Sequence, residues 1–176
     1  MAIREAESYP FHIEEITAAS SLATIAHARD LLLEYGRFVI AQPVCAHFCY
    51  GSLEQEAAGL PLSFSEQGGG CLLARVYGEP TGFVAWRVLP NSISTIAWEL
   101  KRLWVRPSGR GLGMGRALTQ AVLDRAAAAG IEAVFLDTAP AAMQAAYRLY
   151  LQMGFEPCAP YNGNPAEELA YLVKRL

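Results

Sequence analysis

The chain carries four glycines at alternate positions, Gly109, Gly111, Gly113 and Gly115, between a strand-like run and a helix-like run. Ordering glycine costs conformational entropy, so such a cluster indicates that something must approach the backbone closely. The first amides of a helix lack partners within the helix, and the helix dipole adds about half a positive charge there. Glycine lets an anion reach those amides. The segment therefore predicts a pyrophosphate site.

Arg110 and Arg116 lie inside this segment and supply charge-assisted hydrogen bonds to phosphate oxygens. Two familiar phosphate loops are excluded by the spacing. A P-loop needs a lysine after its last glycine, and the dinucleotide fingerprint G-x-G-x-x-G fails because Arg116 and Leu118 occupy the third glycine position in its two registers. A tight turn with exposed arginines is the alternative for this segment taken by itself.

The elements around the glycine run alternate between strand and helix patterns. Apolar runs predict strands over 11–17, 71–77, 81–89, 94–105, 133–138, 155–161 and 169–176. Helical periodicity predicts helices from Ser20 or Ser21 to Gln42-Pro43, and over about 45–58, 111–129 and 140–153. Residues 65–70 are expected to form a flexible connection. This order predicts an α/β (α+β) fold, with a mixed sheet and helices on both faces.

The composition predicts one globular domain over residues 1–176, with 1–10 as a possible tail. Hydrophobic residues make up 53% of the chain and charged residues 18%, and the net charge of −3 gives no reason to expect nucleic-acid binding. No apolar run is long enough for a membrane span, and the N-terminal residues lack the apolar stretch of a secretory signal. We therefore expect a cytoplasmic protein.

The cysteines do not indicate a metal site. Cys45 and Cys49 would share one face of a helix, but the spacings of all four cysteines match no zinc pattern. Buried small hydrophobic side chains are the favoured interpretation, so no metal is predicted.

Residues 103–107, LWVRP, followed by 110–115, RGLGMG, and Ala117-Leu118, resemble the acetyl-CoA binding motif of the GNAT N-acetyltransferase superfamily. A second family signature is matched by Ala146, Leu149-Tyr150 and Gly154-Phe155. The resemblance covers about residues 11–176 and is strongest over 99–155. It extends to a bacterial subgroup of unassigned substrate. It implies a mostly antiparallel central sheet whose fourth and fifth strands run parallel and splay apart.

By this resemblance, coenzyme A lies in the splay, its pantetheine arm pairs with the backbone of 103–105, and its pyrophosphate rests on the amides of 111–116. Trp104 and Thr138 are further candidate contacts. The implied coenzyme-binding residues are Leu103, Trp104, Val105, Arg110, Gly111, Leu112, Gly113, Met114, Gly115, Arg116 and Thr138.

Acetyl transfer to an amine requires a neutral nitrogen, and only about one lysine-like amine in 2,500 is neutral at pH 7. The resemblance makes Glu99 the candidate general base, acting directly or through a water. The alternative is a solvent-facing strand residue, or one that pairs with Lys101 or Arg102. Simple alternation would place Glu99 on the face of its strand that also carries Lys101, Leu103 and Val105.

The leaving thiolate needs a proton, and the resemblance makes Tyr150 the candidate general acid. The alternative is a core tyrosine packed in a row with Tyr147 and Phe155. A backbone N–H near Val105 would stabilise the oxyanion.

The sequence thus predicts an enzyme that moves an acetyl group from acetyl-CoA to a primary amine of a small molecule or peptide by direct attack. The alternative is a non-catalytic acyl-CoA sensor or interaction module. The acceptor pocket is expected between the first two helices and the 61–70 and 90–94 loops, with 162–165 as a candidate border. The acidic balance favours an amine acceptor, and a homodimer is a further possibility.

Overall fold

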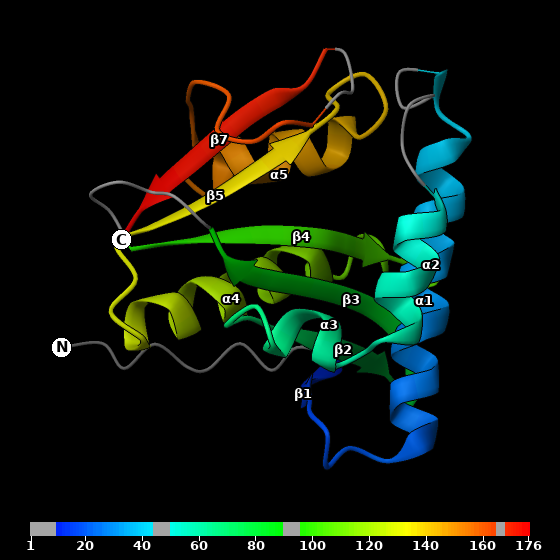
Figure 1. Cartoon of the computed structure of the whole chain (residues 1–176). Helices are drawn as coiled ribbons and strands as arrows, with labels where there is room; N and C mark the ends of the chain where they lie inside the picture. The colour runs from blue at the N-terminus through cyan, green and yellow to red at the C-terminus, as the bar shows by residue number, and fades with distance from the viewer. Residues whose placement is uncertain (1–9, 44–49, 90–95, 165–167) are drawn as a thin grey trace, which may run out of the picture.

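The computed structural model describes residues 10–43, 50–89, 96–164 and 168–176. They form one seven-stranded sheet in the order β1-β2-β3-β4-β5-β7-β6, with helices on both faces (Figure 1). The β4–β5 pair is parallel, and every other neighbouring pair is antiparallel. The predicted mixed, mostly antiparallel sheet is confirmed.

The first half of the chain builds an antiparallel meander with helices on one face. Its elements are β1 (Phe11–Ile16), α1 (Leu22–Ile40), α2 (Tyr50–Ala58), α3 (Leu62–Ser65), β2 (Gly70–Val76) and β3 (Glu79–Val88). The β2–β3 hairpin turns at Tyr77 and Gly78, which both have positive φ, as a two-residue turn between right-twisted strands requires. Ile25, Leu53 and Phe64 bring α1, α2 and α3 onto this face of the sheet.

The second half supplies a parallel crossover and the opposite helical layer. Its elements are β4 (Ala97–Val105), a 3-10 turn (Pro107–Gly109), α4 (Met114–Ala128), β5 (Ala133–Thr138), α5 (Gln144–Gln152), β6 (Glu156–Pro157) and β7 (Ala170–Arg175). Leu118 from α4 and Tyr150 from α5 join one core cluster with Trp98 and Leu100 of β4. The helices α4 and α5 therefore cover the face opposite α1.

The splay between β4 and β5 is visible as two arrows that share one end and diverge (Figure 1). Their paired residues run from Ala97 with Ala133 to Glu99 with Phe135. Past Glu99, the edge of β4 that faces β5 is open. This confirms the predicted gap between the fourth and fifth strands.

A bulge in β4 overturns one prediction about side-chain direction. Arg102 has a left-handed φ of 61°. Phe83 pairs with Trp104 and Ala85 with Lys101, so β4 has one more residue than β3 between these two pairs. Leu103 and Val105 consequently pack on the α4 side together with Leu100. The prediction that they share a face with Glu99 is wrong, because strict alternation holds only without a bulge.

The connection predicted over 65–70 is shorter than expected, because Ser65 ends the short helix α3 and Gly70 begins β2. Leu62–Ser65 form the short helix α3, and Gly69 and Gly70 pack directly on Trp86. A Cβ on Gly70 would lie 2.7 Å from the Trp86 ring. These glycines therefore let the backbone pack closely against Trp86.

Three elements are shorter than predicted. The helix predicted over 111–129 begins at Met114, the one over 140–153 begins at Gln144, and the strand predicted over 155–161 has only two residues. Cys45 and Cys49 lie outside the described residues. Within the described ranges, no helix combines the length and apolar character needed to cross a bilayer.

Candidate functional site

A cleft of about 540 Å³ opens where the end of β4 meets the N-terminus of α4 and the start of α5. Apart from Leu112 and Thr138, every residue predicted to bind the coenzyme lines it. Tyr35 and Phe38 of α1 close one side, while Met143, Ala146 and Leu149 close the other. Leu112 is instead an exposed side chain outside this wall. The predicted site residues are therefore brought together around one cavity.

The glycine run shapes the cleft end nearest α4. Gly111 and Gly113 have φ values of 79° and 78°, a left-handed backbone that favours glycine. The hydrogen bond from the Ala117 amide to the Gly113 carbonyl opens α4. The amides of residues 114–116 precede that bond, so they have no partner in the helix. Since Gly113, Met114 and Gly115 line the cleft, this end can hold an anion.

Both predicted arginines stand at the rim of this end. The Arg110 guanidinium lies over the Trp104 ring, 5.5 Å from its centroid, and its Nε donates to the Val105 carbonyl at 3.2 Å. Arg116 Nη2 donates to Gln152 Oε1 at 3.3 Å. Both side chains are exposed, so either guanidinium can turn toward a phosphate.

A smaller hollow of about 40 Å³ continues the cleft into the gap between β4 and β5. The two spaces share Tyr35, Leu103, Met143 and Ala146 as lining residues. The remaining walls of the hollow come from Leu100, Lys101, Arg102, Asp137, Thr138 and Tyr150. The predicted contact Thr138 and the predicted acid Tyr150 therefore lie at the inner end of the same passage.

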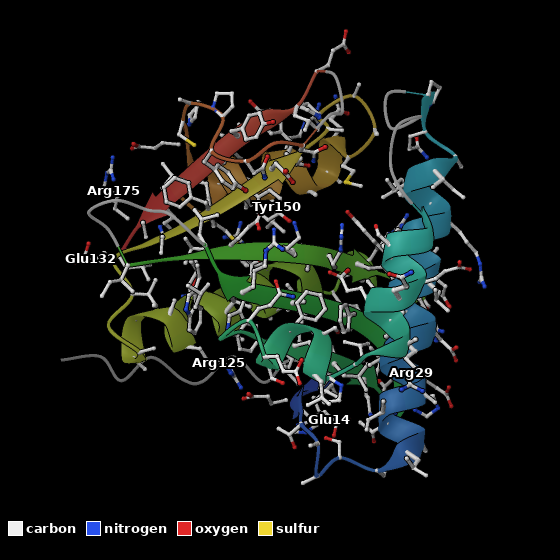
Figure 2. All side chains as sticks on the ribbon, viewed as in Figure 1. Glu14, Arg29, Arg125, Glu132, Tyr150 and Arg175 are labelled. Carbon is white, nitrogen blue, oxygen red and sulfur yellow. The ribbon has the colours of Figure 1, made fainter. Side chains whose placement is uncertain are left out.

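Tyr150 comes from α5 and lies in the gap between the β4 and β5 ribbons in the view of Figure 2. The side chain is buried and packs edge-on against Phe155, with ring centroids 5.6 Å apart. Burial raises the pKa of the phenol, and the charges of Tyr35 and Asp137 add to this effect. Among the described residues its hydroxyl has no hydrogen-bond partner, so it is a protonated donor facing the hollow.

Glu99 occupies a different environment, because its side chain is fully buried and lines neither cavity. Arg87 Nε and Nη2 each lie 2.7 Å from Oε2. The other oxygen, Oε1, accepts from Lys101 Nζ at 3.3 Å, Tyr161 OH at 3.1 Å and Asn162 Nδ2 at 3.2 Å. Burial opposes the charged form of Glu99, but Lys101 and Arg87 outweigh it and lower the pKa of this carboxyl.

The alternative interpretation of Glu99 is therefore confirmed only in part: Glu99 is buried rather than solvent-facing, and it pairs with Lys101 and not with Arg102. Arg102 Nε contacts Glu56 Oε2 at 2.8 Å, and its guanidinium lies over the Tyr35 ring. Because Arg87 and Lys101 stabilise its charged form, Glu99 is a weak acceptor for a proton taken directly from the amine.

Sequence reasoning missed Asp137, the next-to-last residue of the apolar strand β5, which lines the hollow beside Tyr150. Its Oδ2 accepts from Asn162 Nδ2 at 2.8 Å and from Asn164 Nδ2 at 3.0 Å. The signal was available, because Asp137 is the only charged residue in the segment AVFLDT. The 162–164 loop, a candidate border of the acceptor site, is thus fixed at the hollow.

A second missed feature holds α1 against β4. Arg106 contacts Glu34 of α1 through Nε and Nη2, at 3.0 Å to Oε2 and 2.6 Å to Oε1. Trp104 Nε1 also donates to Glu34 at 3.3 Å. The hydrogen bonds from Arg106, against the opposing effect of burial, lower the pKa of Glu34. This bidentate pair fixes the wall of the cleft that carries Tyr35 and Phe38.

Residues 37–155 match the model of the Acetyltransferase (GNAT) family. An uncharacterized N-acetyltransferase of Schizosaccharomyces pombe is 36% identical over 74 residues, which is 42% of this chain and 45% of that protein. The matched stretch thus spans less than half of this curated relative. Within the described residues, no group of three or more His, Cys, Asp or Glu side chains could hold a metal ion.

Solved structures show the same fold over nearly the whole chain. An acetyltransferase from Streptococcus agalactiae superposes with a TM-score of 0.74 at 16% identity, covering 95% of this chain and 99% of that one. The protein yncA from Salmonella typhimurium, solved with its cofactor acetyl-CoA, gives a TM-score of 0.64 at 18% identity, with 94% of each chain covered.

Proposed function

Because the chain belongs to the GNAT acetyltransferase family, we propose that it transfers an acetyl group from acetyl-CoA to a primary amine of a small molecule or peptide. The observation that carries this proposal is that the glycine-lined cleft and the hollow beside Tyr150 lie side by side and share four lining residues. The structural relative yncA supports the choice of co-substrate, since it was solved with acetyl-CoA.

In this proposal the coenzyme follows the cleft from its rim to the hollow. The pyrophosphate rests on the amides of residues 114–116, between Arg110 and Arg116. The pantetheine arm pairs with the open edge of β4 at Leu103–Val105, as an added strand would. That edge is available because β5 leaves β4 after Glu99.

The reaction then needs few groups from the protein. The neutral amine attacks the thioester carbonyl, the new C–N bond forms, and the C–S bond breaks. A backbone N–H near Val105 stabilises the oxyanion, a role typically worth about 100-fold to 1000-fold in rate. Tyr150 donates its phenolic proton to the departing sulfur. Its raised pKa keeps it protonated across the physiological range.

The geometry of the site changes the role proposed for Glu99, the predicted general base. Glu99 is closed off by Arg87, Lys101, Tyr161 and Asn162, so a direct proton transfer from the amine does not fit its surroundings. We propose instead that Glu99 acts indirectly, as a fixed anion that holds Lys101 and Asn162 in place. Among the described residues, a proton can reach Glu99 only through the side chains that contact it, Arg87, Lys101, Tyr161 and Asn162.

The test is release of free thiol from acetyl-CoA in the presence of a panel of primary amines and short peptides. We expect turnover that saturates in both acetyl-CoA and amine. Saturable binding of acetyl-CoA without turnover for any amine would contradict the enzyme and favour the non-catalytic sensor. Absence of coenzyme binding would contradict the assignment of the cleft.

A further inference from the structure

We propose that the carboxylate of Asp137 binds the acceptor as its ammonium ion and takes the first proton from it. This inference rests on the proposed acetyltransferase function and assigns the acceptor end of the same site. It also names the acceptor class, a primary amine that arrives as a cation.

The position of Asp137 carries the inference. Along β5, Val134 and Leu136 point into the core under α4 and α5, while Phe135 packs against Tyr161 on the other face. Asp137 alternates with Leu136, and Asn162 joins it to Glu99 on the face opposite α5. Yet Asp137 and Tyr150 line one hollow. A thioester held at Tyr150 is therefore reachable from the side where Asp137 lies.

Asp137 has no ion pair within contact distance among the described residues, although the charge of Lys101, which lines the same hollow, also acts on it. Lys101 and Arg87 contact Glu99, and Arg102 contacts Glu56. Asp137 Oδ2 accepts from the two asparagine amides, whereas Oδ1 has no hydrogen-bond or ion-pair partner among the described residues. The side chain is only half-buried. A carboxylate oxygen of this kind suits an ammonium group, which has three donors and the opposite charge.

The other ionisable groups around the hollow do not compete for this role. Lys101 and Arg102 from β4 are cations that repel an ammonium group, and both already have carboxylate partners. Tyr150 from α5 and Tyr35 from α1 are phenols. Tyr161 donates to Glu99, and burial together with the Glu99 charge raises its pKa. The loop amides of Asn162 and Asn164 hold the Asp137 carboxylate in one orientation.

The step balances as follows. Asp137 Oδ1 accepts one proton from the ammonium ion and later releases it to solvent. The neutral nitrogen forms the C–N bond as the C–S bond breaks, and Tyr150 gives its proton to the thiolate sulfur. The second proton lost by the nitrogen restores the Tyr150 phenol. The products are the amide, the free thiol and one proton.

A comparison of two nucleophiles tests the charge directly. n-Butylamine is a cation at pH 7.5, whereas methoxyamine is mostly neutral, and both are acetylated at nitrogen. We expect Asp137→Asn to lower kcat/KM for n-butylamine by at least about tenfold and to leave methoxyamine within about twofold, because only the cation loses an ion pair. Asp137→Glu should restore part of the activity with n-butylamine. Equal losses for both nucleophiles, or no loss, would overturn the inference.

Asp124→Asn is the matched control, since Asp124 is an exposed carboxylate on α4 that accepts from Gln120 and lies outside both cavities. It should leave both rates unchanged. A binding measurement separates the inference from the proposed function. Calorimetric titration of the CoA-saturated protein with n-butylammonium should show binding to the wild type and not to Asp137→Asn. Equal binding would overturn the inference, whereas wild-type binding without thiol release from acetyl-CoA would contradict only the acetyltransferase proposal.

Discussion

Glu99 and Asp137 share one hydrogen-bond donor, Asn162, but their other contacts give the two carboxylates different chemical roles. Asn162 donates to both Glu99 and Asp137, yet Glu99 is fully buried among cations while Asp137 is half-buried at a cavity. A carboxylate saturated by positive charge holds its proton weakly. The same residue type therefore serves as a structural anion at one position and is available to a ligand at the other.

Tyr150 allows the sharpest prediction at the scale of a residue. We expect Tyr150→Phe to lower kcat by about 10-fold to 100-fold, because a general acid is lost, and to leave the Kd for acetyl-CoA within about twofold. Rapid kinetics of thiol release and calorimetry with acetyl-CoA measure the two quantities. The wild-type kcat should show no fall from Tyr150 ionisation up to about pH 10, because burial raises its pKa.

Tyr147→Phe is the control for that experiment. Tyr147 lies on the same helix, is partly buried against the same core and lines neither cavity. It should keep the parental kcat. An unchanged kcat in Tyr150→Phe would remove this tyrosine from the mechanism and support the core-tyrosine interpretation.

The sequence predicted the elements best where local backbone chemistry decides the structure. The left-handed Gly111 and Gly113, followed by a helical period, predict the start of α4 within a few residues. The bulge at Arg102 could not be predicted in this way. Arginine has no intrinsic preference for positive φ, and the contacts with Glu56 and Tyr35 that accompany this conformation come from other elements.

The turn before α4 carries a prediction at the scale of an element. Gly113→Val forces a β-branched residue into a left-handed backbone, so we expect a loss of roughly 1–2 kcal/mol in unfolding free energy. It also puts methyl groups beside the amides assigned to the pyrophosphate, so the Kd for acetyl-CoA should rise at least about tenfold. Urea denaturation and calorimetry measure these two effects.

Gly78→Val separates strain from binding. Gly78 has a φ of 86° in the β2–β3 turn, has open space around its Cα and lies away from the cleft. We expect a similar loss of unfolding free energy with normal coenzyme affinity. If Gly113→Val bound acetyl-CoA normally, the pyrophosphate would have to lie elsewhere.

At the scale of the whole molecule, the site lies where two neighbouring strands of the sheet separate. The β4 and β5 strands pair only over Ala97–Glu99 and Ala133–Phe135 before the gap opens. Across that gap, Glu99 connects the β1–β4 part of the sheet, through Arg87 and Lys101, to the β5–β7 part, through Tyr161 and Asn162. Apart from the Glu99–Lys101 pair, this cluster could not be predicted from the sequence, because Arg87, Tyr161 and Asn162 are far from Glu99 in the chain and meet it only in the folded sheet.

This arrangement predicts that Glu99 stabilises the contact between the β1–β4 and β5–β7 parts of the sheet, and that this effect depends on pH. Its pKa is lower in the folded chain than the ordinary value of 4.5, so its stabilising effect is complete above that value and is lost as the pH falls through the lowered folded value. We expect Glu99→Gln to cost about 3 kcal/mol at pH 7, because two cations lose their buried partner. The difference from the wild type should shrink below about pH 4.5.

Urea denaturation at pH 7 and below pH 4.5 measures that difference, and hydrogen exchange locates it. Amides of β4 and β5 near the gap should exchange faster in Glu99→Gln, while those of the β2–β3 hairpin should change only with global stability. Glu15→Gln is the control, since Glu15 forms an exposed pair with Arg125 at 3.3 Å and should cost less than about 1 kcal/mol. A Glu99→Gln protein with parental stability at pH 7 would show that Glu99 does not hold the β1–β4 and β5–β7 parts of the sheet together. The indirect role proposed for Glu99 in catalysis would then lack its structural basis.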